Sequence, residues 1–249
     1  MKIKLISIVL IVFVLSSCSL NDSGSDIADG SASEGTGGSL ACFTIIGNYL
    51  YTVDNQQLKI ANISDPAHPS HIKSINLGFD IETVSPRDDK LFVGSMWGMY
   101  IFDLSQNPED PTQLSFYDHL FSCDPVVADE NYAYVTLNTE SWLCGRSTNA
   151  LQIVDITDLR NPKLIFNTSL ESPHGLSIKN DTLYVCDAGL KVFKLAENRK
   201  NISQLQHFNI SATDVIRIDN HLLVVGDDGF YQYQIKNNEI KLLSSLLTD

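Results

Sequence analysis

Short runs of β-branched and aromatic residues, separated by polar turns, follow one another from residue 40 to the end of the chain, without a helical period. Such runs predict β-strands. A second strand of a repeated unit occurs at 49–54, 90–95, 132–137, 182–187 and 221–226. A third strand follows at 58–63, 99–104, 151–156, 190–195 and 230–235. The unit therefore occurs five times.

The spacing of the units predicts the architecture. The leading position of each second strand is held by Leu50, Leu91, Ala133, Leu183 and Leu222, with gaps of 41, 42, 50 and 39 residues. A period of about 40–45 residues with four strands per unit is typical of a β-propeller blade. We therefore expect an all-β fold, a propeller of five four-stranded blades; a β-sandwich is the alternative, but it would not show this period.

The first (inner) and fourth (outer) strands of each blade are expected before the second strand and after the third strand. In blade two the inner strand is expected at Ile81–Ser85 and the outer strand at Gln113–Tyr117. The first inner strand is expected at Phe43–Ile46 and the last outer strand at Ile240–Leu246. No strand exchange that would lock the last blade to the first is apparent, so the sequence leaves the closure of the propeller open.

The amino terminus has the pattern of a secretion signal. Two lysines precede a largely apolar run from Leu5 to Leu15, which is too short for a membrane-spanning helix of about 20 residues. The sequence 15–18 resembles a bacterial lipobox, which implies cleavage after residue 17 and acylation of Cys18; the alternative is an ordinary signal peptide. Ser19 is typical of lipoproteins sorted to the outer membrane. We expect a lipid-anchored protein of the bacterial outer membrane or cell surface.

Composition divides the chain into three segments. Residues 1–17 form the signal peptide. Residues 18–39 form the lipidated cysteine and a flexible acidic tether with six Ser, five Gly and no aromatic residue, a composition that cannot bury a core. Residues 40–249 form the propeller.

The net charge of −13, from 30 acidic and 17 basic residues, argues against a nucleic-acid partner, because such binding depends on Lys and Arg. Removal of the signal, with its two lysines, makes the chain more acidic. An acidic surface is repelled by anionic lipid head groups, so the membrane contact is expected through the lipid itself.

The third strand of blade three, with its turn, carries a family resemblance. Residues 151–156, LQIVDI, followed by 159–162, LRNP, resemble the LVIVD repeat. Weaker copies lie at 58–66 and 99–105, whereas Lys194 and Gln234 replace the aspartate of the motif in blades four and five. The sequences of segments 122–127, 173–176 and 226–229 also resemble stretches of lipoproteins of this family from Bacteroidota. The resemblance implies a secreted or lipid-anchored propeller and no particular activity; Asp65 and Pro66 are interpreted as turn residues.

Four cysteines remain beside Cys18. We expect Cys123 and Cys144 to form a disulfide that fixes the long turn of blade three, and Cys42 and Cys186 to be free, buried thiols. No Cys-x-x-Cys or His-x-x-x-His spacing occurs, so no metal site of the zinc type and no cofactor is expected.

One set of residues suggests a binding site at the propeller axis. Counting back from the leading positions puts Glu82, Asp124, His174 and Asp214 at the entry to four inner strands. These side chains could form a ring that holds a cation or small ligand, or an acid–base pair. The alternative is that they cap backbone amides or bind water in the channel.

We therefore expect a binding or interaction module whose ligand the sequence does not identify, with a glycan or an envelope protein as partner. Trp97 and Trp142, in turns of blades two and three, would either stack on sugars or pack on neighbouring turns. The alternative function is a glycan-processing hydrolase or lyase that uses the axial carboxylates, so no residue is assigned as catalytic.

Overall fold

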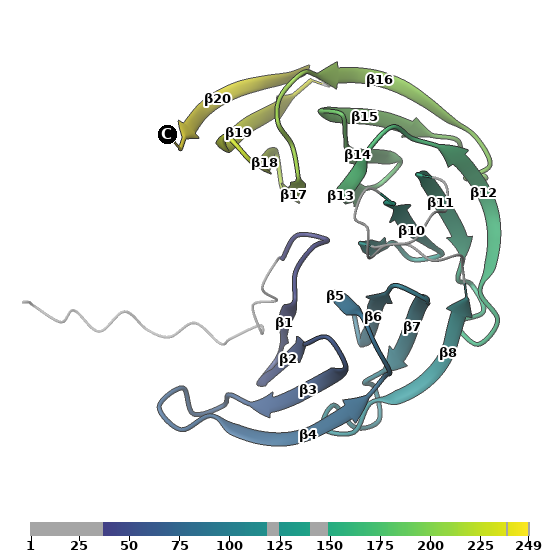
Figure 1. Cartoon of the computed structure of the whole chain (residues 1–249), viewed down its shortest axis with the longest axis vertical. Helices are drawn as coiled ribbons and strands as arrows, with labels where there is room; N and C mark the ends of the chain where they lie inside the picture. Colours follow the sequence, from purple (N-terminus) through teal and green to yellow (C-terminus); the bar gives the residue numbers. More distant parts are fainter. Residues whose placement is uncertain (1–36, 119–124, 140–148, 238, 249) are drawn as a thin grey trace, which may run out of the picture. The chain divides into compact units, whose positions relative to one another are not determined.

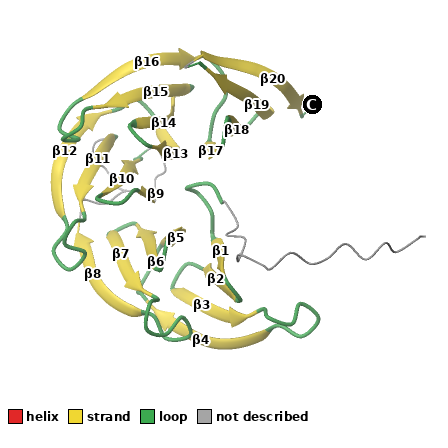
Figure 2. Cartoon of the chain, turned by 180° about the vertical axis from the view of Figure 1, so that it is seen from behind, coloured by secondary structure: helices red, strands yellow, loops and turns green. Residues whose placement is uncertain are grey.

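The computed structural model describes residues 37–118, 125–139, 149–237 and 239–248, all within one compact unit that spans 32–249. The described residues contain strands and loops and no helix (Figure 2). They form five four-stranded antiparallel sheets, each built from four strands in chain order (Figure 1). The predicted five-bladed β-propeller is confirmed.

The strand bounds follow blade by blade. Blade one contains β1 (Phe43–Ile46), β2 (Tyr49–Val53), β3 (Gln57–Asn62) and β4 (Ser70–Asn76). Blade two contains β5 (Ile81–Arg87), β6 (Lys90–Ser95), β7 (Gly98–Asp103) and β8 (Thr112–Asp118). Blade three contains β9 (Val126–Ala128), β10 (Tyr132–Leu137), β11 (Ala150–Asp155) and β12 (Lys163–Ser169). Blade four contains β13 (Pro173–Lys179), β14 (Thr182–Asp187), β15 (Leu190–Leu195) and β16 (Ile202–Phe208). Blade five contains β17 (Asp214–Ile218), β18 (His221–Gly226), β19 (Gly229–Lys236) and β20 (Glu239–Leu247).

A bulge recurs at the same place in every blade, between the third and fourth strands. The pairing shifts after Ile60, Ile101, Ile153, Val192 and Gln232. A bulge bends its strand and increases the local twist. This repeated bulge therefore accounts for the curvature of the long outer strands in Figure 1.

Successive blades are joined by buried side chains that alternate along the second and third strands. Leu91 and Val93 of β6 face blade one, where they meet Tyr51 and Ile60, whereas Phe92 between them faces blade three. Similar buried clusters join blades three to four and four to five. Both faces of an interior blade are thus apolar, which explains why its strands are more continuously hydrophobic than those of a half-exposed sheet.

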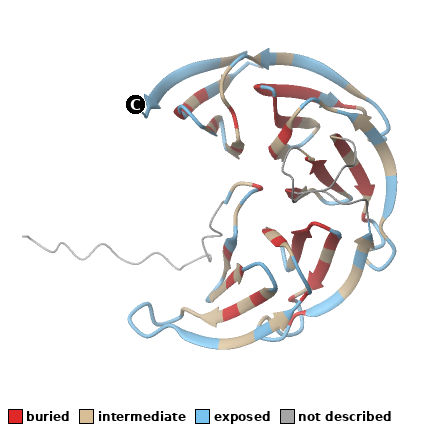
Figure 3. Ribbon diagram, in the orientation of Figure 1, coloured by how far each residue is buried: buried red, intermediate tan, exposed pale blue. Residues whose placement is uncertain are grey.

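The contact between blade five and blade one lacks such a cluster among the described residues. The positions in blade five that correspond to Tyr51 and Val53 are Leu223, which is half-buried, and Val225, which is 41% exposed. Figure 3 shows the long outer strands of the blades mostly in the colours of exposed and intermediate residues. On blade one, the position corresponding to the buried Val93 is the half-buried Thr52. The two terminal blades therefore do not bury a shared core.

A short segment before β1 connects the terminal blades instead. Ser39 is only 2% exposed; its hydroxyl donates a hydrogen bond to Asp214 Oδ1 of blade five at 3.1 Å and accepts one from the Leu176 backbone N–H of blade four at 2.7 Å. We call residues 38–40 the latch. The expected boundary of the tether at residue 39 therefore differs from the structure, in which Ser39 is part of the propeller.

The aspartate of the repeated motif has a local structural role. Asp155 accepts hydrogen bonds from the hydroxyl and the backbone N–H of Thr157, at 2.7 and 3.0 Å, and the hydroxyl bond is the main cause that lowers the pKa of Asp155. Asp103 likewise accepts the backbone N–H of Ser105 at 2.9 Å. These bonds close the turn after the third strand, as an Asx turn does.

Several predicted residues lie outside the described part of the chain: Cys18, Cys123, Asp124, Trp142 and Cys144. The disulfide, the lipidation and the signal peptide therefore stay predictions. Cys42 and Cys186 are free thiols as predicted, but only Cys186 is buried, and Cys42 is exposed. In the part of the chain that is described, no helix is long and apolar enough to cross a membrane.

Candidate functional site

Three of the four predicted axial residues are described, and each lies on an inner strand as expected. Glu82 is on β5, His174 is on β13 and Asp214 begins β17. Within the described ranges, no three His, Cys, Asp or Glu side chains are grouped in a way that could hold a metal ion. Glu82, His174 and Asp214 therefore do not make a cation site by themselves.

The carboxylate of Asp214 is occupied by the chain's own latch. It accepts the hydroxyl of Ser39, the backbone N–H of Val215 at 2.9 Å and the backbone N–H groups of Ser39 and Leu40. A Cβ atom added to Gly38 or Gly175 would lie 1.9 or 2.1 Å from the carboxylate oxygens, so only glycine fits at both places. Burial nevertheless raises the pKa of Asp214, because the hydrogen bonds offset only part of the desolvation.

His174 lies between Ser172 and Asn138, an arrangement that has the members of a nucleophile, base and orienter set. The Nδ2 group of Asn138 donates to the Pro173 carbonyl at 2.7 Å and lies 3.4 Å from His174 Nδ1. On the other side of the ring, Nε2 lies 3.4 Å from Ser172 Oγ. The ring of His174 is therefore held between a side chain of blade three and the turn before β13.

A buried ion pair lies next to this cluster. Asp187 is fully buried and accepts hydrogen bonds from Lys191 Nζ at 2.9 Å and from the backbone N–H groups of Glu171 and Ser172 at 2.9 and 2.7 Å. These bonds fix the start of β13. The pair is satisfied within the protein, so it offers no unmet polar group to a ligand.

A groove with a volume of about 660 Å³ lies between blades four and five. We call it the blade four–five groove. Its apolar floor is formed by Tyr184, Val192, Ile235 and Ile240. Its polar rim consists of Lys179, Asn180, Asp181, Thr182, Lys194, Gln206 and Arg217. The size and the apolar lining with a few polar groups are typical of a small-molecule site.

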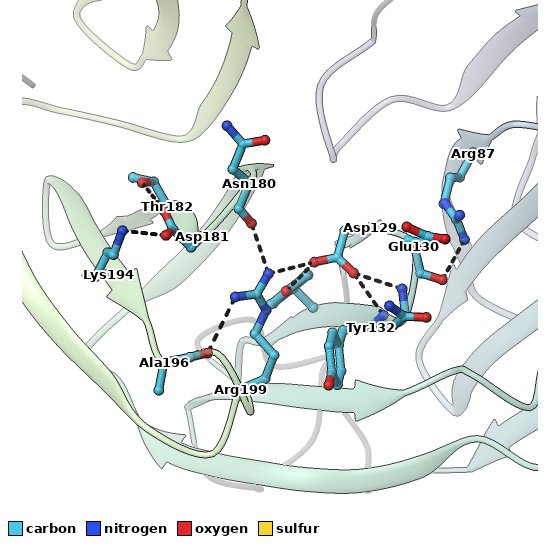
Figure 4. Close-up of polar contacts among 12 residues, drawn as sticks. Arg87, Asp129, Glu130, Tyr132, Asn180, Asp181, Thr182, Lys194, Ala196 and Arg199 are labelled. Atoms are coloured by element: carbon cyan, nitrogen blue, oxygen red, sulfur yellow. Dashed lines mark hydrogen bonds and ion pairs between the residues drawn. The ribbon is translucent and has the colours of Figure 1, made fainter. Parts of the chain in front are cut away.

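The rim of the groove is positively charged, although the whole chain carries −13. Lys179, Lys194 and Arg217 contribute three positive charges, and Asp181 contributes one negative charge. Asp181 forms an ion pair with Lys194, and Figure 4 shows the two side chains turned toward each other at the edge of blade four. Lys179 and Arg217 therefore give the groove a net attraction for anions.

Two buried polar atoms in the groove lack a hydrogen-bond partner: Nε of Arg217, a donor, and Oε1 of Gln206, an acceptor. The guanidinium of Arg217 uses its Nη1 for a contact with the His221 carbonyl at 3.4 Å, which leaves the Nε group without an acceptor. An unmet buried polar group costs about 1–3 kcal/mol. A groove that keeps one unmet donor and one unmet acceptor is therefore suited to a ligand that supplies both partners.

The sequence comparison with known families is clear at two stretches. The LVIVD repeat pattern matches residues 37–76 and 122–169, which contain blades one and three. This chain carries LVIVD repeats. No functionally curated protein matches its sequence.

Solved structures resemble the LVIVD propeller in fold. A candidate 6-phosphogluconolactonase of Bacteroides fragilis has a TM-score of 0.65 at 11% identity, over 83% of this chain and 70% of that chain. The periplasmic gluconolactonase of Pseudomonas aeruginosa has a TM-score of 0.61 at 13% identity, over 81% and 68%. A protein of Lactobacillus plantarum has a TM-score of 0.64 at 14% identity, over 81% and 68%. At these identities the likeness shows the fold alone.

The groove was not predicted from the sequence. Two departures from the repeat could have indicated it. Through the strand pairing, Arg217 corresponds to Ile45, Pro86, Ala128 and Ile178 of the other blades. Lys194 likewise stands where the motif has aspartate. Both departures from the repeat lie on the two blades that frame the groove, and a residue that breaks a structural repeat is a candidate for a function beyond folding.

A second depression, with a volume of about 460 Å³, lies between blades three and four, and Arg199 forms part of its lining. Arg199 donates to the carbonyl of Asn180 at 3.0 Å, contacts Asp129 at 3.4 Å and lies over the ring of Tyr132 (Figure 4). Asp129 also accepts the hydroxyl of Tyr134 at 2.6 Å. These contacts join the two blades. Arg199 Nε is also buried without a partner among the described residues, but the blade four–five groove combines an unmet donor with an unmet acceptor and is the stronger candidate for a ligand.

Proposed function

We propose that this protein is a binding module of the bacterial cell envelope, anchored by a lipid on Cys18, and that its blade four–five groove holds a small ligand. The observation that carries the proposal is the pair of unmet buried atoms, Arg217 Nε and Gln206 Oε1, in an apolar-floored groove of about 660 Å³. A rigid blade pair supplies both groups, so little ordering entropy opposes binding.

The lipid anchor is supported by the sequence of residues 1–19. A tether of about 20 residues would let the propeller move above the membrane while the groove samples its surroundings. Substitution Cys18→Ala tests this part: we expect the variant to leave the membrane fraction for the soluble fraction, and equal membrane association of both proteins would contradict the anchor.

Ligand binding is tested by blocking the groove. Leu205 lies at its edge and is 57% exposed, so Leu205→Trp should fill part of the volume without disturbing the core. Leu164, which is 47% exposed on the outer strand of blade three, offers a matched control as Leu164→Trp. We expect a panel of sugars, organic acids and short glycans to contain a compound that raises the melting temperature of the wild type and the control, and not that of Leu205→Trp. Equal shifts in all three proteins, or no shift with any compound, would contradict binding in the groove.

A second candidate function is hydrolysis of a sugar ester or glycan, since the solved structures that share this fold include proteins named as gluconolactonases. The 3.4 Å separation of His174 Nε2 and Ser172 Oγ is longer than the hydrogen bond by which a base activates a serine. Release of acid from gluconolactone, measured as base consumption, would favour this second function if His174→Gln abolished it without lowering the melting temperature.

A further inference from the structure

Resting on the proposed function, we infer that the ligand of the blade four–five groove is a polyhydroxy carboxylic acid, either a free sugar acid or the terminal uronic acid of a glycan. The two unmet atoms define the hydrogen-bonding groups that the ligand must provide. Arg217 Nε needs an acceptor, and Gln206 Oε1 needs a donor. A sugar acid carries both, because its carboxylate accepts and its hydroxyl groups donate.

The charges of the groove decide between an acid and a neutral sugar. Asp181 is already engaged by Lys194, so the positive charges of Lys179 and Arg217 are not compensated within the groove. A neutral sugar would satisfy the two unmet atoms but would leave these charges without a partner. A carboxylate satisfies Arg217 by hydrogen bond and by charge, and a planar guanidinium suits a planar carboxylate.

The floor of the groove decides between a sugar acid and a simple organic acid. The apolar surface open to a ligand comes mainly from Ile235 and Ile240, because Val192 and Tyr184 beneath it are only 2% and 4% exposed. The C–H faces of a pyranose or of an extended sugar chain pack on such a surface, whereas acetate would leave most of it wet. The volume of about 660 Å³ accommodates one sugar unit with room for a second.

Calorimetric titration of the full chain tests the inference with four probes: D-glucuronate, D-gluconate, D-glucose and acetate. We expect the two sugar acids to bind at least tenfold more tightly than glucose and acetate. The difference should shrink in high salt, because screening weakens the attraction between the rim and the carboxylate.

Substitutions separate the two contacts. Arg217→Gln should weaken sugar-acid binding at least tenfold, and Arg217→Lys should restore part of it, because the charge returns without the planar fork. Gln206→Met keeps the length of the side chain and removes the acceptor, so it should weaken the sugar acids and leave the weak binding of acetate unchanged. Arg160→Gln, an exposed arginine in the turn after the third strand of blade three, is the control.

The outcomes distinguish this inference from the proposed function. If glucose binds as tightly as the sugar acids and Arg217→Gln has no effect, the ligand class is wrong while binding in the groove stands. If none of the probes and no compound of the wider panel binds, the proposed function fails as well. A glucuronate-terminated oligosaccharide tells the two sources apart: tighter binding than the monosaccharide indicates a glycan end, and weaker binding indicates a free sugar acid.

Discussion

The latch formed by residues 38–40 predicts that Asp214 is a main determinant of stability where blades four and five meet the start of blade one. The change to test is Asp214→Ala. It removes the acceptor for the Ser39 hydroxyl, at 3.1 Å, and for the backbone N–H groups of Ser39, Leu40 and Val215. The Ser39 and Leu40 donors belong to the latch, whereas Val215 belongs to β17 of blade five itself.

The expected cost follows from these contacts. A hydrogen bond to a charged group contributes about 1.5–3 kcal/mol. Several hydrogen bonds are lost in Asp214→Ala. The variant also removes the unfavourable desolvation of the buried carboxylate, which is the cause of its raised pKa. We therefore expect Asp214→Ala to lower the free energy of unfolding by about 2–4 kcal/mol, within the range that loss of a buried polar network produces.

The raised pKa of Asp214 also predicts a pH dependence. The folded protein binds this proton more readily than the unfolded chain, whose carboxyl has the ordinary value of 3.8. The contribution of Asp214 to stability is therefore fully present below that value and declines as pH rises through the folded pKa. The advantage of the wild type over Asp214→Ala should thus be larger at pH 4.5 than at pH 7.

Urea unfolding followed by circular dichroism measures these free energies, and hydrogen exchange at the amide of Leu40 reports the latch directly. Asp227→Ala is the control, because Asp227 is exposed in the turn between β18 and β19 of the same blade. Ser39→Ala and the double variant complete a cycle, in which we expect a coupling of about 1–2 kcal/mol, as for residues of one network. A cost below about 0.5 kcal/mol for Asp214→Ala, or fully additive variants, would refute the latch.

Three further predictions follow from the same region. Gly175→Ala should destabilise the protein and release the latch amide to exchange, because its Cβ would lie 2.1 Å from a carboxylate oxygen; unchanged exchange would show that the backbone yields freely. Lys191→Met should cost about 3–5 kcal/mol in urea unfolding, since it leaves the fully buried Asp187 without its cation, and a cost under 1 kcal/mol would contradict the buried pair. Iodoacetamide with peptide mapping should modify the exposed Cys42 quickly at pH 8 and Cys186 only after unfolding, because burial raises the pKa of the Cys186 thiol; equal rates would contradict that burial.

The strands were predictable because their signals are local. The alternation of side chains and the polar turns repeat every 40–50 residues, so the five copies reinforce one another, and β6, β10, β14 and β18 begin and end where the pattern places them. The turn role predicted for Asp65 is confirmed, because Asp65 accepts a hydrogen bond from the backbone N–H of Ala67, only two residues away. The register also placed Glu82, His174 and Asp214 on inner strands correctly.

What these inner-strand residues do could not be predicted in the same way. Counting along the strands suggested that Asp214 faces a channel ligand, whereas its partner is Ser39, 175 positions away in the chain. The polar composition around Ser39 predicted a flexible tether. Composition alone does not show that the buried carboxylate of Asp214 accepts the backbone N–H groups of Ser39 and Leu40. The position of the His174 ring likewise depends on Asn138, a side chain of blade three.

The sequence by itself therefore determined the five blades, their strands and their turns, since each depends on residues a few positions apart. The tertiary structure alone decided the latch and the blade four–five groove. Arg217 and Gln206 belong to different blades, and only the packing of one sheet on the next buries their unmet atoms in one groove. Burial makes the difference, because the same two side chains on an exposed strand would be satisfied by water and would need no ligand.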